Sequence, residues 1–186
     1  MTYRPRNRIW KPTALTESIV GLVDLLDHLR VTDEYDTTLI QGYARAATSY
    51  VEKSTQRLLS VRTATLTLPD LPGLQEPIEL PGGDVASITS MVVDGTPFTT
   101  IAAYGSAPAA LIPTGTTQWP STSQMGWPVT ITYQVGYETA PFELVQAIKL
   151  LVGEMYNHRS NAEDVIQSRT MLPSEMLIAP YRITPL

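Results

Sequence analysis

Residues 141–159, PFELVQAIKLLVGEMYNHR, are the stretch that decides the fold. Pro141 suits the first turn of a helix, where a backbone N–H has no helical partner. Glu143 stands near the start and Arg159 at the end, which places each charge where the helix dipole favours it. Apolar side chains recur at three- and four-residue spacing, namely Leu144, Val145, Ile148, Leu151, Val152 and Met155. The pattern predicts one amphipathic helix that must bury its apolar face against another element.

The predicted packing partner lies far upstream, in residues 34–58. This stretch keeps helical spacing through Leu39, Ile40, Tyr43, Ala46, Ala47, Tyr50 and Val51. Its small residues Gly42, Ala44, Ala46 and Ala47 would let a second helix approach closely. A shorter amphipathic helix is predicted over residues 22–30, LVDLLDHLR, with leucines on its buried stripe. The three helices together predict a small bundle.

The character of the sequence changes between residues 60 and 134. Residues 61–68 alternate in the way that a half-buried strand requires, and residues 129–135, VTITYQV, are the clearest strand. Residues 88–93 run into Asp94-Gly95, a signal for a two-residue hairpin, and strand-like residues 98–104 follow. Residues 109–112 form a further short candidate. We therefore expect an antiparallel β subdomain of about five strands.

The fold class expected from these patterns is α+β, a helical bundle core with an inserted antiparallel β subdomain. The predicted organisation has an N-terminal arm over residues 1–15 and a helical core made of residues 16–59 and 136–159. The β subdomain occupies residues 60–135, and a C-terminal docking tail occupies residues 160–186. Trp10 is the residue expected to anchor the arm, because an exposed Trp is costly to leave in water.

The net charge of -5 is distributed unevenly. Four basic residues, Arg4, Arg6, Arg8 and Lys11, stand in the first eleven positions; removing them from 13 basic residues leaves 9 against 18 acidic ones, a net charge of -9. Such a body is poorly suited to binding duplex DNA directly, which needs basic surface. The chain has no Cys, which excludes disulfides and thiolate metal sites and suits an intracellular origin. No apolar run is long enough to span a membrane.

No arrangement of residues predicts an active site. His28 and His158 each stand near the end of a predicted helix, where a histidine stabilises the helix without a catalytic role. No metal-ligand spacing occurs, and the double glycine at 82–83 precedes no predicted helix. We expect a protein that is not an enzyme and has no metal or cofactor. The aromatic residues near the last strand favour either a β core or a stacking platform for a sugar or base, and they are Trp119, Trp127, Tyr133 and Tyr137.

A series of short motifs occurs in a fixed order along the chain. They are HLRV at 28–31, YARAA at 43–47 with YVE at 50–52, Thr55 and Arg57, WP at 119–120, VTITY at 129–133, GY at 136–137, Pro141, Ala147-Ile148, Leu150-Leu151, Tyr156 and Arg159, and LP at 172–173 with LIAPYR at 177–182. In this order they resemble the head-to-tail connector (adaptor) proteins of long-tailed bacteriophages and gene transfer agents. The resemblance spans most of the chain, and residues 69–127 match it only loosely. One departure is Gln56, where the family often has Gly.

The resemblance implies a structural virion protein of the neck, made in the bacterial host cytoplasm. Members of this family form a homo-oligomeric ring, commonly of twelve subunits, between the portal protein and the stopper or next tail-connector protein. DNA passes through the channel of the ring without sequence-specific binding. The acidic body of this chain agrees with a channel wall that repels DNA and lets it slide.

The apolar tail is the predicted contact with the portal or a neighbouring subunit. The interface residues we predict are Leu172, Pro173, Leu177, Ile178, Pro180, Tyr181 and Arg182, together with Trp10. The competing interpretation is that the tail packs on its own helices. Two other functions stay open, a carbohydrate- or receptor-binding module built on the β subdomain and a hydrolase with an unrecognised site.

Overall fold

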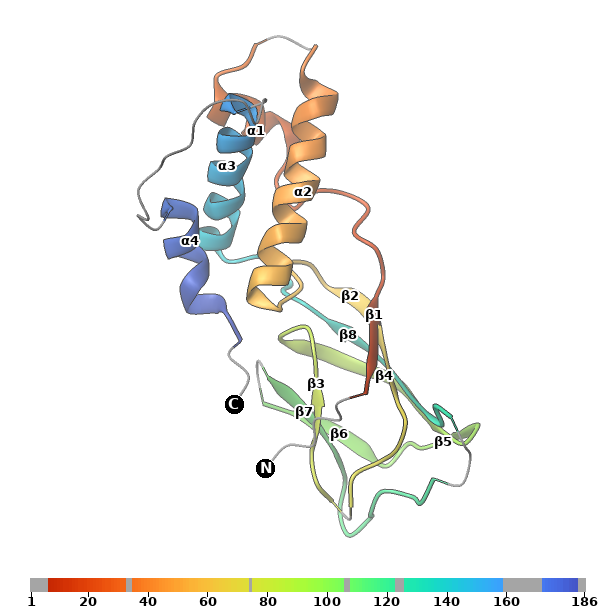
Figure 1. The fold of residues 1–186 in the computed structure, drawn as a ribbon. Helices are drawn as coiled ribbons and strands as arrows, with labels where there is room; N and C mark the ends of the chain where they lie inside the picture. Colours follow the sequence, from red (N-terminus) through yellow and green to blue (C-terminus); the bar gives the residue numbers. More distant parts are fainter. Residues whose placement is uncertain are drawn as a thin grey trace. The chain divides into compact units, whose positions relative to one another are not determined.

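The structure is a computed structural model that describes residues 7–32, 35–73, 75–105, 108–122, 126–158 and 172–183. The chain folds as two compact units, which we call the β unit (residues 1–14 and 60–138) and the helical unit (residues 15–59 and 139–186) (Figure 1). The mixed α+β fold predicted from the sequence is confirmed. The predicted boundaries within residues 1–6, 159–171 and 184–186 lie outside the described residues.

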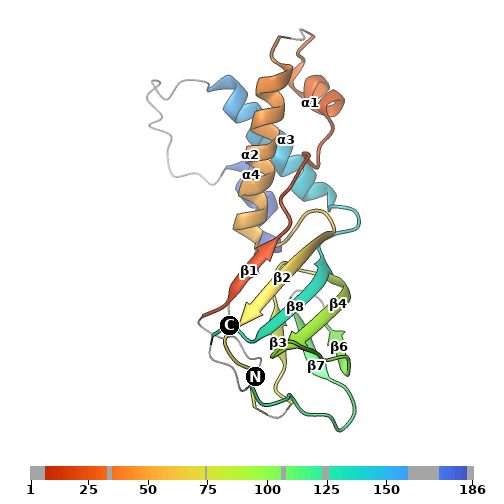
Figure 2. The ribbon, with the colours of Figure 1, turned by 90° about the vertical axis from the view of Figure 1, so that its right-hand side faces the viewer.

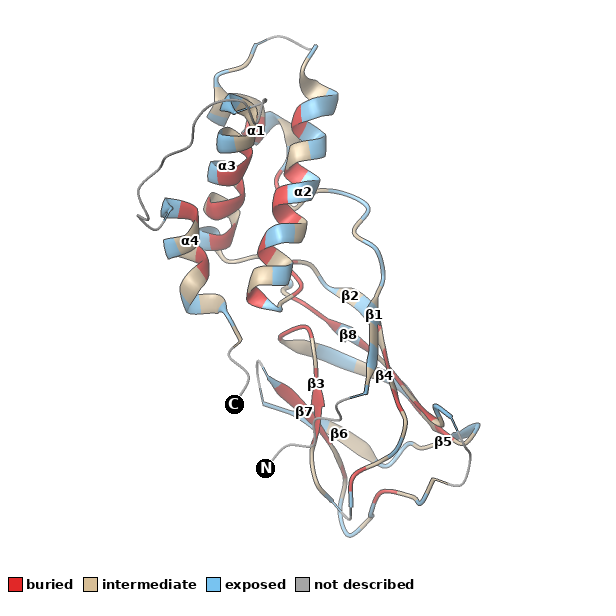
Figure 3. Cartoon of the chain, viewed as in Figure 1, coloured by how far each residue is buried: buried red, intermediate tan, exposed pale blue. Residues whose placement is uncertain are grey.

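The helical unit is built from α1 (Leu22–Leu29), α2 (Thr37–Thr55), α3 (Phe142–Asn157), the short α4 (Pro173–Ile178) and the 3-10 turn η1 (Ala179–Tyr181). All three helices predicted from periodicity are present. Helix α3 packs against α1, α2 and α4. Its buried face, marked red in Figure 3, comprises Leu144, Ala147, Ile148, Leu151 and Val152. The core of this unit therefore joins residues from both ends of the chain.

The buried face of α2 differs from the predicted apolar stripe. Leu39, Ala46 and Tyr50 are exposed, and the face toward the core comprises Ile40, Ala44, Ala47, Thr48, Val51 and Thr55. Two polar residues can be buried there because each hydroxyl donates to the carbonyl four residues earlier. Thr48 Oγ1 lies 2.7 Å from Ala44 O, and Thr55 Oγ1 lies 2.8 Å from Val51 O. Their polarity is satisfied inside the helix, so small methyl-bearing side chains face the core.

Neighbouring alanines on α2 provide a test of this face. Ala47→Leu should lower the free energy of unfolding by about 1–3 kcal/mol, because Ala47 is fully buried and the added atoms overfill the core. Ala46→Leu should change it by less than about 0.5 kcal/mol, since Ala46 is exposed. Urea unfolding followed by circular dichroism measures both. Equal effects of the two substitutions would contradict the observed helix orientation.

The described residues of the β unit form eight strands, where the sequence predicted about five. The strands are arranged in two antiparallel sheets (Figure 2). The five-stranded sheet has the order β1 (Ile9–Pro12), β2 (Arg62–Leu68), β8 (Val129–Val135), β4 (Val85–Val93) and β5 (Thr96–Pro97). The three-stranded sheet has the order β3 (Ile78–Leu80), β7 (Ala109–Pro113) and β6 (Ile101–Tyr104). The strands not predicted separately are all short, and β1 comes from the N-terminal arm.

The central pair β2 and β8 carries the core of the larger sheet. Leu66 pairs with Ile131 and Leu68 with Val129, and all four side chains are fully buried. The alternate residues of β2, such as Thr65, stay at least partly exposed. The alternation of residue types along these strands therefore matches the alternation of buried and exposed faces, as the period-2 geometry of strands requires.

The predicted hairpin at Asp94-Gly95 is present, but the strand after it divides between the two sheets. Both turn residues have positive φ, 50° for Asp94 and 79° for Gly95, which matches a two-residue hairpin turn. β5 pairs with β4 only at Val92 and Val93. The chain then turns sharply, since Ile101 N–H donates to Thr99 O at 3.0 Å. From there it enters the smaller sheet as β6.

Helix α2 ends at a residue with left-handed backbone geometry. Gln56, the C-cap, has φ 57° and ψ 30°. This region favours Gly, because a Cβ crowds the following carbonyl. Gln56 replaces the glycine that is common at this position of the connector pattern, and its backbone geometry is one that suits glycine.

Candidate functional site

The described part of the helical unit contains an open cavity of appreciable size near α1 and α2. A cavity of about 420 Å³ lies between residues 16–25 and α2, and Glu17 and Arg45 are its charged lining residues. Within the described ranges, no three His, Asp or Glu side chains gather closely enough to hold a metal ion. Nor is any described helix both long and apolar enough to cross a membrane. The predicted interface residues belong to two surfaces, one in the helical unit and one in the β unit.

The first surface is the C-terminal segment, residues 172–183, which contains α4 and η1. It lies against α2 and α3 of its own chain. Ile178 is fully buried there and Ser174 nearly so. Two hydrogen bonds to main-chain oxygens add to this packing. The side-chain Nε of Arg57 donates to Tyr181 O at 2.8 Å, and the backbone N–H of Ile183 donates to Thr55 O at 3.1 Å. The segment is therefore docked on its own helical unit.

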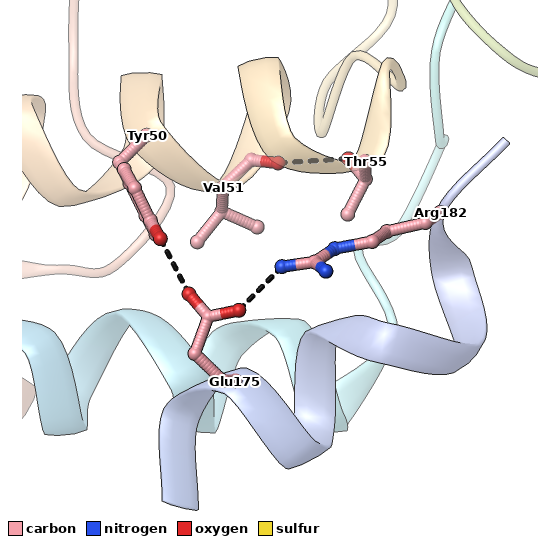
Figure 4. Close-up of polar contacts among 5 residues, drawn as sticks. All are labelled: Tyr50, Val51, Thr55, Glu175 and Arg182. Atoms are coloured by element: carbon pink, nitrogen blue, oxygen red, sulfur yellow. Dashed lines mark hydrogen bonds and ion pairs between the residues drawn. The ribbon is translucent and has the colours of Figure 1, made fainter. Parts of the chain in front are cut away.

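A cluster of polar side chains ties the same segment to α2 (Figure 4). Glu175 of α4 accepts a hydrogen bond from the hydroxyl of Tyr50 and forms an ion pair with Arg182. Nearby, Tyr181 Oη donates to Glu143 Oε2 at 2.9 Å, so the tail also bonds to the first turn of α3. The backbone N–H of Glu143, and then the Tyr181 hydroxyl, lower the pKa of the Glu143 carboxyl. Because these side chains are partly exposed, their bonds add little to the free energy of unfolding. They fix the orientation of the C-terminal segment on α2 and α3.

The Tyr50 hydroxyl gives this cluster a testable pH dependence. The hydrogen bond to Glu175, and then burial, raise the pKa of Tyr50 above its ordinary value of 10.0. The stabilisation from this group is therefore complete below about pH 10 and is lost as the pH rises through the raised pKa of the docked state. We expect the tail to loosen in alkali, visible in the methyl NMR signal of Ile178. Tyr50→Phe should flatten this alkaline change; an identical pH profile in the variant would contradict it.

The predicted interface residues of the tail fall into three groups, which are exposed, half-buried and buried. Leu172, Pro173, Pro180 and Arg182 are exposed, while Leu177 and Tyr181 are half-buried. Ile178 is buried inside the helical unit, so its side chain is not presented to a partner in this conformation. Met176, which the sequence interpretation left out, is 62% exposed on α4. The sequence could have indicated Met176 as an interface residue through its position in the apolar tail. That its side chain points outward is shown only by the orientation of α4.

Trp10, the remaining predicted interface residue, lies in the β unit and contacts its own chain. Its indole Nε1 donates to the hydroxyl of Tyr133 at 3.0 Å, and that hydroxyl donates to Pro81 O at 2.9 Å. Gly82 lies beneath the indole, with φ +104°; a Cβ there would come within 3.0 Å of both Trp10 Cζ2 and Val135 Cγ2. The arm is further held by Arg8, whose Nη1 lies 3.7 Å from Glu79 Oε1.

Tyr133 is the buried centre of this anchor. It is fully buried, and burial raises its pKa well above the ordinary tyrosine range, so its hydroxyl stays protonated. Two other aromatic residues of the predicted stacking platform differ in exposure. Trp119 is buried, and its indole N–H donates to Glu76 O at 2.9 Å, whereas Trp127 is 44% exposed. Trp119 and Tyr133 are thus core residues of the β unit.

Removing one hydroxyl should loosen the arm. Tyr133→Phe leaves Trp10 Nε1 and Pro81 O without the partner they share, and we expect a loss of about 1–3 kcal/mol in the free energy of unfolding. Hydrogen exchange of the β1 amides should also become faster. Tyr104→Phe is the control, because Tyr104 is 48% exposed. If β1 protection is unchanged in Tyr133→Phe, the hydrogen-bonded anchor is not what holds the arm.

Comparison with known proteins finds solved structures with a similar fold. Neither a protein-family model nor a curated protein matches the chain. A chain from the neck of an empty GTA particle, computed with C6 symmetry, superposes with a TM-score of 0.77 at 21% identity, covering 96% of this chain and 97% of that chain. This chain shares the fold of a gene transfer agent neck structure. Chains from the virion of a native gene transfer agent (GTA) particle and from the native GTA neck computed with C12 symmetry match with TM-scores of 0.74 and 0.70, at 22% and 21% identity and the same coverage.

Proposed function

We propose that this chain is a structural component of the neck of a phage-like particle, a head–tail adaptor. The observation that carries the proposal is the shared fold with chains of gene transfer agent neck structures over 96% of this chain. The match includes both units, so the likeness is not limited to a common helical or β motif. The connector motifs of the sequence, from residues 28–31 to residues 177–182, support the same assignment independently.

The proposed assembly is a ring of identical subunits between the portal and the stopper or tail. The C6 and C12 symmetry of the related neck structures supports a cyclic arrangement, and twelve copies is the number we propose. DNA would pass through the ring without sequence-specific contacts, consistent with an acidic body. The protein would act in the virion neck after synthesis in the bacterial host cytoplasm, without catalysis.

The proposed contact with the portal is the exposed side of the C-terminal segment. Leu172 and Met176 present apolar surface there, and Arg182 adds a charged group held by Glu175. Aromatic, Met and Arg side chains are enriched at protein interfaces. The buried Ile178 would instead fix the segment on its own subunit.

Electron microscopy of the full chain mixed with portal rings from the same genome tests the proposal. We expect symmetric extra density at one end of the portal, from which the subunits can be counted. Met176→Glu should weaken this binding at least about tenfold, because it places a charge in the centre of the contact. Val23→Glu is the matched control, since Val23 is an apolar residue of α1 that is 72% exposed.

Two results would count against the proposal. Absence of the chain from the necks of purified particles, shown by mass spectrometry or labelling, would refute the neck assignment. Normal portal binding by Met176→Glu would refute only the contact assigned to the C-terminal segment.

A further inference from the structure

The edges of the two sheets differ in how they are protected. An edge strand leaves a row of main-chain N–H and C=O groups that another strand can pair with, and proteins commonly block such edges with Pro, charge, bulges or burial. In the β unit the edges are β1 and β4–β5 of the larger sheet, and β3 and β6 of the smaller one.

Three of the four edges carry a recognised form of protection. β1 contains Lys11 and Pro12. The β4–β5 edge contains Pro97, and the pairing of β4 has two register shifts, between Val85 and Ser87 and between Ile88 and Ser90. β3 is buried along its whole length and carries a charged residue, Glu79, at its centre.

The fourth edge, β6, has none of these features. Its sequence is Ile-Ala-Ala-Tyr, and its pairing with β7 has no register shift. Ala103 and Tyr104 are exposed. The strand also lies inside residues 95–137, which contain no Asp, Glu, Lys, Arg or His. A flat, uncharged and accessible edge is the kind that pairs with another chain.

The hydrogen-bond pattern shows which main-chain groups face outward. Thr114 N–H donates to Thr100 O at 3.0 Å, which fixes the alternation along the β6–β7 ladder. By that alternation Ala102 and Tyr104 exchange hydrogen bonds with β7, whereas the N–H and C=O of Ala103 point away from it. Among the described strands, only β7 is hydrogen-bonded to β6 in the sheet, and β4 of the larger sheet also comes close to β6.

A cavity beside the start of β6 adds a place for side chains. It has a volume of about 250 Å³ and lies where the chain leaves β4 for the smaller sheet. Its lining residues are uncharged, and they are Ile88, Thr89, Ser90, Met91, Pro97, Phe98, Thr99 and Ile101. Strand addition commonly joins main-chain pairing with pockets of this kind, which receive alternate side chains of the added strand.

We propose that the β6 edge pairs with an extended segment of a second copy of this chain. The charge distribution selects that partner: copies with a net charge of -5 repel one another, and they meet at least electrostatic cost through a surface without charge. The cores of interfaces are likewise depleted in charged residues. The inference rests on the proposed ring, because a ring places copies of the chain side by side, and it specifies one surface of their contact.

Self-association of the full-length chain tests this surface. Ala103→Pro removes the outward N–H while leaving the β7 hydrogen bonds in place, and Ala103→Lys puts a charge on the edge. Each should raise the dissociation constant measured by sedimentation equilibrium at least about tenfold. Ala103→Ser, which keeps the N–H, should associate like the original chain. So should Thr63→Lys, which places the same charge on an exposed position of β2 in the other sheet.

The outcomes separate this inference from the neck assignment. If Ala103→Pro is misfolded by circular dichroism, Ala103→Lys decides the result. A chain that stays monomeric at every accessible concentration, or that associates equally well with Pro or Lys at position 103, overturns the edge-pairing inference. The neck assignment has its own measurement, the presence of the chain in particle necks, so either can fail while the other holds.

Discussion

The structure depends on the packing of α3 against α2, two helices that are separated in sequence by residues 60–138 of the β unit. The contact works because both faces are made of small and medium side chains: Ala44, Ala47 and Thr48 on α2, and Ala147 and Ile148 on α3, all fully buried. Residues 60–138 therefore leave the bundle after α2 and return to it before α3, and they form the β unit together with residues 1–14. The C-terminal segment then covers what α2 and α3 leave open on one side.

Local sequence pattern predicted the elements that are long and regular. The helix expected over residues 141–159 is observed as Phe142–Asn157, and the strand over residues 129–135 has the predicted bounds. The buried face of α2 was harder to predict, because it includes the polar residues Thr48 and Thr55. Their hydroxyls donate hydrogen bonds to carbonyls of the same helix, so these side chains can be buried like apolar ones. β3 escaped prediction because three residues with a central Glu79 show no alternation.

The interaction surfaces could be predicted less well than the fold. The residue pattern indicated an apolar tail but not that Ile178 faces inward and Met176 outward, since six helical residues define no reliable face. Trp10 and Tyr133 are 123 residues apart, and no local signal joins them. The uncharged run of residues 95–137 is plain in the sequence, whereas the edge position of β6 within that run becomes visible only when the chain divides between two sheets.

The distance between α2 and α3 along the chain also bears on how the protein forms on the ribosome. Helix α2 ends at Thr55, and α3 does not begin until Phe142. At ~5–20 residues per second, synthesis of residues 56–141 takes roughly 4–17 s, during which the part of α2 that packs on α3 lacks that partner. The β unit, complete at residue 138, is synthesised before that partner emerges. The nascent chain can therefore form the contact between α2 and α3 only after the strands of the β unit have been synthesised.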